Sequence, residues 1–231
     1  MLNKIKQFLN HSNQILKPFE VENSYPLHIN YLLENCFRSY DLLITIETLL
    51  KSSKTKKEHE HPIGILLRSG LYDFINFQYV SNKSIENQSI NKEIFEKEAR
   101  GYMNDHYSRI NTSFKLHERY KSLDRFKDFE PAKKSNNLKV LKTGKEFAKQ
   151  KKLIAMEDAI NLWEWYSKYE HHGVFTNHIY NHVENNDRVK SSIHYLFSNI
   201  YFSLCILSDL DSSILKIDQV KPLQAIILKP F

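Results

Sequence analysis

Apolar residues recur every three or four positions through most of this chain, which is the spacing of an α-helix with one buried face. Pro26 and Pro62 stand where a helix can take proline at its first position. The pattern predicts about seven helices, over residues 3–17, 26–52, 62–80, 90–123, 145–152, 156–172 and 187–210. We expect the helices over 62–80, 156–172 and 187–210 to be the central ones.

Glycine and proline are scarce, with 5 and 6 among 231 residues. A fold rich in strands needs many tight turns, and those turns favour both residues. We therefore expect an all-α fold, an irregular helical bundle without a sheet, forming one domain over residues 1–231. Residues 124–144 are expected to be a mobile basic connector, and the tail 211–231 to lie back over the bundle.

The most apolar stretch, residues 193–210, raises the question of a membrane span. Polar residues interrupt it, whereas a span needs about 20 predominantly apolar residues. We expect a buried core helix and no membrane association. No signal peptide is recognised, and Cys36 and Cys205 each lie in an apolar helical pattern typical of reduced thiols, so a cytoplasmic location is expected.

Positive charge is concentrated in one segment. The chain carries 33 Lys and Arg against 27 Asp and Glu, a net charge of +6. Residues 115–152 hold 13 of the basic and 5 of the acidic residues, a local +8, which leaves −2 for the rest. Such a segment can bind phosphate backbones, so RNA is an expected partner through residues 115–152. The alternative is a solvated, lysine-rich connector.

Two apolar helices carry polar groups that need partners. Arg68 lies within the apolar run 65–74, and a buried guanidinium must be paired. Trp163, Ser167 and His171 are spaced four apart and so share one helix face. We predict that Arg68, Tyr72 and these three residues converge in one pocket. In the alternative, His171 is a satisfied core histidine and Arg68 forms a structural ion pair, with candidate partners Asp73, Glu34 and Glu47.

These two motifs resemble those of a widespread, uncharacterised bacterial family of helical proteins, some of whose members lie among phage-defence genes. The second motif of that family, an aromatic residue, Ser and His at four-residue spacing, matches the helix that ends near His171. In the first motif Arg68 matches, but Tyr72 occupies the position of a Glu, and the nearest acid is Asp73. The resemblance covers about residues 35–80 and 155–205, and implies a helical fold and a candidate pocket.

A second resemblance rests on Arg and His separated by five residues, at Arg100–His106 and Arg188–His194. The spacing is similar to the signature of a helical ribonuclease superfamily of toxins and defence effectors, in which Arg and His from a dimer cut RNA without a metal. Gly101 and Val189 depart from the polar residue common after the arginine. The later match is preferred because it begins a core helix. This resemblance implies RNA cleavage and a homodimer.

Histidines also gather at His171, His172, His178 and His182. Two of them are four residues apart, which would suit one metal ion on a helix. The set matches no strong zinc spacing, so we expect no metal. No Gly-rich phosphate loop and no nucleophile elbow is present, so we expect no cofactor.

Two classes of function stay open at this point. The first is an RNA-directed toxin or antiviral effector in which Arg68, Ser167, His171, Arg188 and His194 are the candidate catalytic residues. The second is a non-catalytic protein-interaction module in which the same groups are structural. A metal-dependent hydrolase that uses the histidine cluster is a third, weaker alternative.

Overall fold

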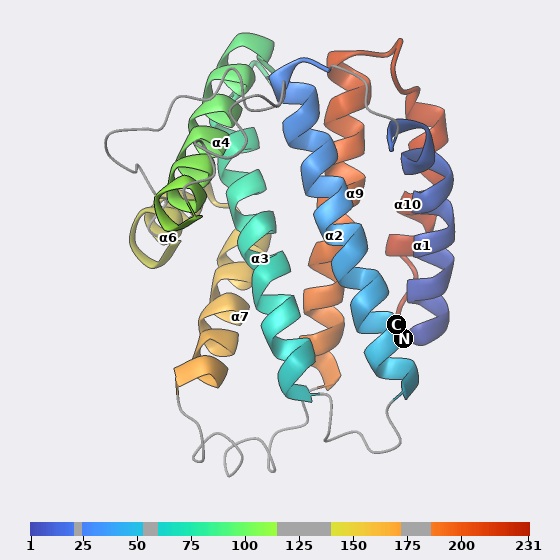
Figure 1. The fold of residues 1–231 in the computed structure, drawn as a ribbon. Coiled ribbons are helices and arrows are strands. Elements are labelled where there is room, and N and C mark those ends of the chain that lie inside the picture. The colour runs from blue at the N-terminus through green and yellow to red at the C-terminus, as the bar shows by residue number, and fades with distance from the viewer. Residues whose placement is uncertain (21–24, 53–59, 115–139, 172–185) are drawn as a thin grey trace.

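The computed structural model describes residues 1–20, 25–52, 60–114, 140–171 and 186–231. Within these ranges it contains eight α-helices and one small hairpin (Figure 1). The helices are α1 (Leu2–Leu16), α2 (Leu27–Ser52), α3 (Glu60–Lys83), α4 (Lys92–Phe114), α6 (Lys145–Lys151), α7 (Ile154–His171), α9 (Asn186–Leu210) and α10 (Ile217–Ile227). The predicted all-α bundle is confirmed.

The core lies where α9 packs against α2, α3 and α10 (Figure 1). By length and composition alone, α9 could cross a membrane. In the bundle its apolar stripe faces the other helices, and six of its apolar side chains are fully buried: Ile193, Leu196, Phe197, Ile200, Leu204 and Leu207. The sequence pattern therefore identified the core helix correctly. α3 packs along both α7 and α9, so it joins this core to α7.

Gly70 sets how closely α3 approaches α9. A β-carbon added at Gly70 would lie 2.7 Å from Cδ1 and 2.9 Å from Cγ of Leu196, closer than ordinary van der Waals contact. Leu196 is fully buried and has little room to move. The glycine is therefore needed for its lack of a side chain, which fixes the α3–α9 distance.

The two ends of the chain lie side by side (Figure 1). α10 packs against α1 and α9, so the tail returns over the bundle as predicted. The ammonium group of Lys4 donates to the carbonyl oxygens of Ile227, at 3.1 Å, and of Lys229, and it lies 4.1 Å from the centroid of the Phe231 ring. These contacts hold the first and last helices together.

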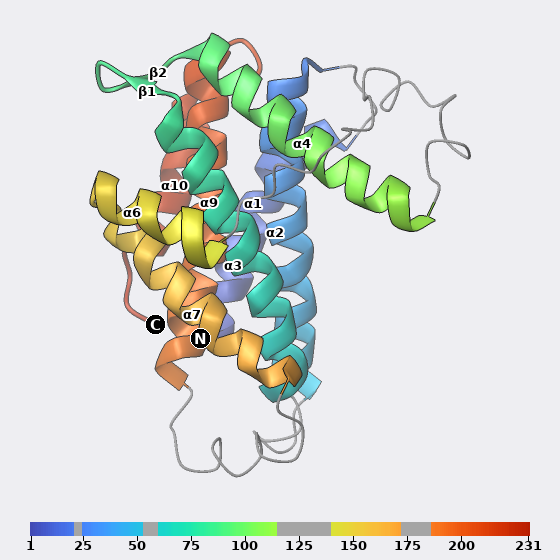
Figure 2. The same cartoon turned by 90° about the vertical axis from the view of Figure 1, so that its left-hand side faces the viewer.

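The structure departs from the sequence prediction around residues 81–90. α3 continues to Lys83, three residues beyond the predicted end, and a two-stranded antiparallel hairpin, β1 (Ile85–Glu86) and β2 (Ser89–Ile90), follows where no strand was expected (Figure 2). The turn residues Asn87 and Gln88 have φ of 49° and 69°. Hairpin turns with both central residues at positive φ usually contain glycine, which is absent here.

Several boundaries also differ. α3 begins at Glu60, two residues before Pro62, and α10 forms a helix in the tail despite Pro222. A π-helical turn, Val140–Gly144, precedes α6. The helix predicted to reach residue 123 is described as far as Phe114, and most of the predicted mobile connector, residues 124–139, lies outside the described residues.

Candidate functional site

The predicted meeting of Arg68 with the aromatic helix occurs at the contact between α3 and α7. Arg68, Tyr72 and Tyr79 share one face of α3, because Tyr72 follows Arg68 by four residues and Tyr79 follows it by eleven. Trp163 and Ser167, four apart, share one face of α7. The long packing of α3 on α7 brings these two faces together. Four of the five residues expected in the pocket therefore lie at one contact.

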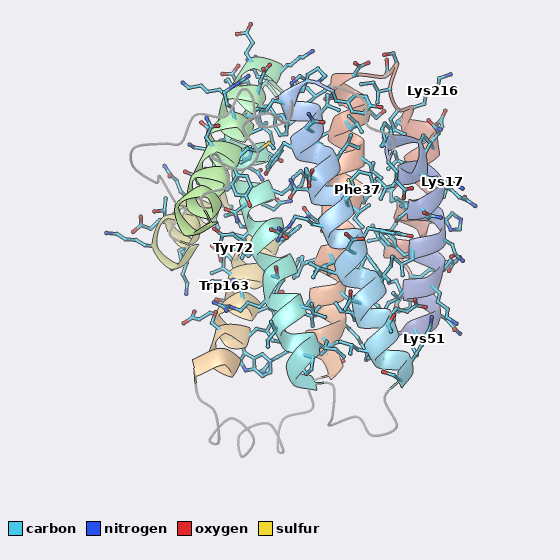
Figure 3. All side chains as sticks on the ribbon, viewed as in Figure 1. Lys17, Phe37, Lys51, Tyr72, Trp163 and Lys216 are labelled. Atoms are coloured by element: carbon cyan, nitrogen blue, oxygen red, sulfur yellow. The ribbon has the colours of Figure 1, made fainter. Side chains whose placement is uncertain are left out.

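The Ser167 hydroxyl is the centre of this cluster. It accepts a hydrogen bond from Nε of Arg68 at 3.1 Å and donates to the Trp163 carbonyl oxygen at 2.8 Å. The Arg68 guanidinium carbon lies 5.3 Å from the Trp163 ring centroid, within cation–π range. Tyr72 completes the group, its ring centroid 6.4 Å from that of Trp163, and Figure 3 shows these two side chains where α3 and α7 meet. Arg68 is thus held in one orientation.

His171 is the last residue of α7, one turn beyond Ser167. Its side chain lies outside the described residues. The structure therefore places the backbone of His171 on the expected helix, while its place in the pocket remains a prediction.

Part of the basic segment packs on the same side of α7. Residues 140–152 contain five lysines and one glutamate, and they form the π-helical turn and α6, which contact α3 and α7. Nζ of Lys145 lies 3.9 Å from a carboxylate oxygen of Glu164, next to Trp163. The Phe147 ring centroid lies 4.7 Å from that of Tyr79 on α3. Lys145 thus lies next to the Trp163 end of the cluster, and the rest of residues 140–152 packs on α3 and α7. Residues 115–139 lie outside the description.

Asp73, proposed from the sequence as a partner of Arg68, pairs instead with Arg38 of α2. Nε of Arg38 donates to Oδ2 of Asp73 at 3.0 Å, and the Asp73 side chain is only 5% exposed. Burial raises the pKa of Asp73, and the adjacent guanidinium opposes that shift. The same carboxylate raises the pKa of Arg38. Glu47, another proposed partner, pairs with Lys51 at 2.8 Å.

Sequence reasoning missed Arg38, although a signal was present. Like Arg68, it is a guanidinium in an apolar helix, directly after Phe37 and two residues after the fully buried Cys36. Such a position indicates a paired cation. The ion pair of Arg38 and Asp73 joins α2 to α3.

The second predicted pair, Arg188 and His194, is divided between two clefts. The Arg188 guanidinium lies 4.4 Å from the ring centroid of Trp165 on α7, in a cleft of about 350 Å³. His194, six residues later, lines a neighbouring cleft of about 440 Å³. A six-residue separation turns the two side chains toward different sides of α9. Within one chain they do not form a single Arg/His constellation.

The remaining candidate residues form no comparable cluster among the side chains that the structure describes. Arg100 lies 3.4 Å from Glu96, four residues earlier, and the His106 side chain lies outside the described residues. Among the residues that the structure describes, no three His, Cys, Asp or Glu side chains are grouped to hold a metal. The clustered histidines His171, His172, His178 and His182 are not among the side chains it describes.

Comparisons with known proteins yield no relative: no family model, no curated protein and no solved structure matches this chain. Trp163 and Trp165 lie on two sides of α7, the first against Arg68 of α3 and the second against Arg188 of α9.

Proposed function

We propose that this protein is an RNA-directed effector, of the toxin or antiviral kind, that holds RNA on the face formed by α6, the π-helical turn and α7. The observation that carries the proposal is that the lysine-rich residues 140–152 pack on the two helices, α3 and α7, that hold Arg68, Trp163 and Ser167, with Lys145 next to Glu164. Lysines attract phosphates irrespective of base sequence. Arginine and aromatic side chains are the usual partners of unpaired bases.

The proposed chemistry uses arginine and histidine. Arg68, held by Ser167, would donate to a phosphate oxygen and stabilise the negative charge that develops during cleavage. His171 would move a proton at the reacting ribose hydroxyl or at the leaving oxygen. This assignment keeps the metal-independent ribonuclease activity expected from the sequence.

RNA binding is tested by fluorescence anisotropy with a labelled single-stranded RNA at several salt concentrations. The variant replaces the exposed residues Lys142, Lys149 and Lys151 by Gln. The control replaces the exposed residues Lys17, Lys51 and Lys216, which lie away from α6 and α7 (Figure 3) and give the same change in net charge.

We expect the first triple variant to lose about tenfold in affinity at physiological salt. Its slope of log affinity against log salt should fall by about 2, since each phosphate contact on a single strand contributes about 0.7. The control should match the wild type. Equal losses in both triple variants, or no binding by the wild type, would sink the proposal.

Catalysis is tested separately with His171→Ala and Arg68→Lys. His171→Ala should keep the melting temperature of the wild type but abolish RNA cleavage in vitro and growth inhibition in cells. Arg68→Lys keeps the charge but loses the planar fork that can donate to Ser167 and to a phosphate together. We expect it to bind RNA and to cleave slowly.

A non-catalytic protein-interaction module is the second candidate. It is favoured by one observation: Ser167 and Trp163 already contact Arg68. In this alternative, the role of the three residues is structural, and they join α3 to α7. In that case both lysine variants bind RNA equally poorly, and Arg68 substitutions change stability alone. The metal-dependent hydrolase rests on His178 and His182, outside the described residues, and elemental analysis of the purified protein tests it.

A further inference from the structure

A cleft of about 440 Å³ opens beside the first turns of α9. This volume falls within the usual range of small-molecule sites. Its described lining is Asp187, Lys190, Ser191, His194, Tyr195 and Phe231. It shares Asp187 and Ser191 with the smaller cleft that holds Arg188. The proposed RNA face uses none of these residues.

Of the charged side chains that line the larger cleft, the less exposed one is positive. The Lys190 side chain is 34% exposed, and the Lys4 ammonium is close enough to act on His194. Asp187 pairs with Lys190 at 3.1 Å, but its side chain is 93% exposed, so water screens most of its charge. The other nearby carboxylate, Asp158, lines the smaller cleft. These groups favour an anionic ligand.

The Tyr195 hydroxyl fixes the wall between the two clefts. It donates to Oδ2 of Asp158 at 2.7 Å, which links α9 to α7 and occupies that carboxylate. One face of the Tyr195 ring is supported by Phe74 of α3, with centroids 4.9 Å apart. The Phe231 ring stacks on Phe197, with centroids 6.0 Å apart, and the Lys4 ammonium also lies 4.1 Å from its centroid. Two aromatic rings that line the cleft are therefore backed from within the core.

We propose that this cleft binds a small organic phosphate of nucleotide size, with Lys190 and His194 at the phosphate and Tyr195 and Phe231 against its heterocyclic group. Lysine is a common phosphate ligand, and stacking on aromatic rings accepts any base. The proposal rests on the cleft alone and is independent of the RNA face.

His194 gives the site a signature in pH. Burial, followed by the charge of Lys4, lowers its pKa, and its surroundings include Lys190 and Asp187 on α9 and Asp158 on α7. Both causes favour the neutral imidazole when no ligand is bound. A bound phosphate supplies negative charge beside the ring and favours its protonation. Affinity should therefore rise as the pH falls from 8 to about 7, a range in which the phosphate keeps most of its second negative charge.

The test is titration calorimetry with AMP, inorganic phosphate and adenosine as probes. AMP should bind more tightly than either fragment. Lys190→Gln should weaken AMP binding by about tenfold, the usual size of one charge-assisted hydrogen bond. The matched control is Lys221→Gln, because Lys221 also pairs with an Asp three residues earlier, Asp218, but lines neither of the two clefts described here. It should bind as the wild type does.

Proton NMR of His194 provides the second measurement. AMP should raise the pKa of this ring, and His194→Gln should bind more weakly and lose the pH dependence. No AMP binding at millimolar concentration, or binding unchanged by Lys190→Gln, would overturn the site. Equal affinities for AMP and inorganic phosphate would overturn its aromatic half. AMP should still bind the triple variant at Lys142, Lys149 and Lys151, so failure of the RNA proposal is distinguishable.

Discussion

Two arginines contact two tryptophans on opposite sides of α7, and the contacts differ in what surrounds them. Arg188 lies closer to its ring, 4.4 Å from the Trp165 centroid, than Arg68 does to Trp163, at 5.3 Å. Arg68, however, also donates to Ser167 between two long packed helices, whereas Arg188 lines an open cleft near the start of α9. The shorter ring distance therefore does not identify the firmer contact. The hydrogen bond to Ser167 and the packing of α3 on α7 make the Arg68 contact the firmer one.

The largest expected effect compares the two arginines directly. Arg68→Ala removes a hydrogen bond, a cation–π contact and the packing of the side-chain stem, so unfolding free energy should fall by about 2–3 kcal/mol. Arg188→Ala should cost under about 1 kcal/mol, because it loses a contact at an open cleft. Urea denaturation of both variants measures this. Equal costs would show that the two contacts are equivalent.

A second test concerns the other side of α3, two residues beyond Arg68. Gly70→Ala should destabilise by about 1–3 kcal/mol, because the new methyl group meets the buried Leu196. Gly101→Ala is the control, since a β-carbon there meets nothing within 4 Å on α4. The control should gain about 0.5–1 kcal/mol from helix propensity. Thermal unfolding of both variants should show shifts of opposite sign, and a stabilised Gly70→Ala would contradict the close α3–α9 approach.

Two serines sharpen the comparison further. Ser167→Ala should cost about 1 kcal/mol, the net value of the hydrogen bond from Arg68. Ser191 is exposed on α9 and lines both clefts, so Ser191→Ala should leave the free energy of unfolding almost unchanged. A double-mutant cycle of Arg68 and Ser167 should give a coupling of about 0.5–1 kcal/mol. Strictly additive effects would remove Ser167 as the group that orients Arg68.

The smallest effect is on the pH dependence of stability. Burial, the largest cause, lowers the pKa of His28, whose side chain is 4% exposed and whose Nδ1 lies 3.6 Å from Glu96. His194 is shifted in the same direction. Since the unfolded chain binds these protons more tightly, stability should be complete above about pH 6.5 and decline as the pH falls below it.

Melting curves at pH 7.5 and 5.5 measure that decline. His28→Gln should reduce it more than His194→Gln, because His28 is buried between helices and His194 faces an open cleft. A melting temperature that rises toward pH 5.5 would show that the pKa shifts have the opposite sign.

Much of the fold could be predicted because helical periodicity runs through every long apolar segment. Pro222 concealed α10, since proline inside a helix argues against one, although burial of Val220, Leu223 and Ile226 stabilises that helix. The hairpin was missed because Asn87 and Gln88 provide positive φ without glycine.

The candidate site could be predicted only in part. Spacing brought Trp163 and Ser167 onto one face of α7, and the need for a partner brought Arg68 to them. Periodicity states which side of its own helix a residue occupies, but not which neighbouring helix that side meets. Asp73 was therefore one of three candidate partners of Arg68, whereas it pairs with Arg38. The separation of Arg188 from His194, in contrast, follows from their six-residue spacing on α9 and could have been predicted.

The contact of Lys4 with the carbonyl groups of Ile227 and Lys229 also bears on protein engineering. Because both ends of the chain meet there, a short peptide could join residue 231 to residue 1 and give a circular backbone without distorting the bundle. Ring closure of a chain this long would remove about 5 kcal/mol of conformational entropy from the unfolded state. A circular form would hold α1 against α10 even where the ammonium contact breaks.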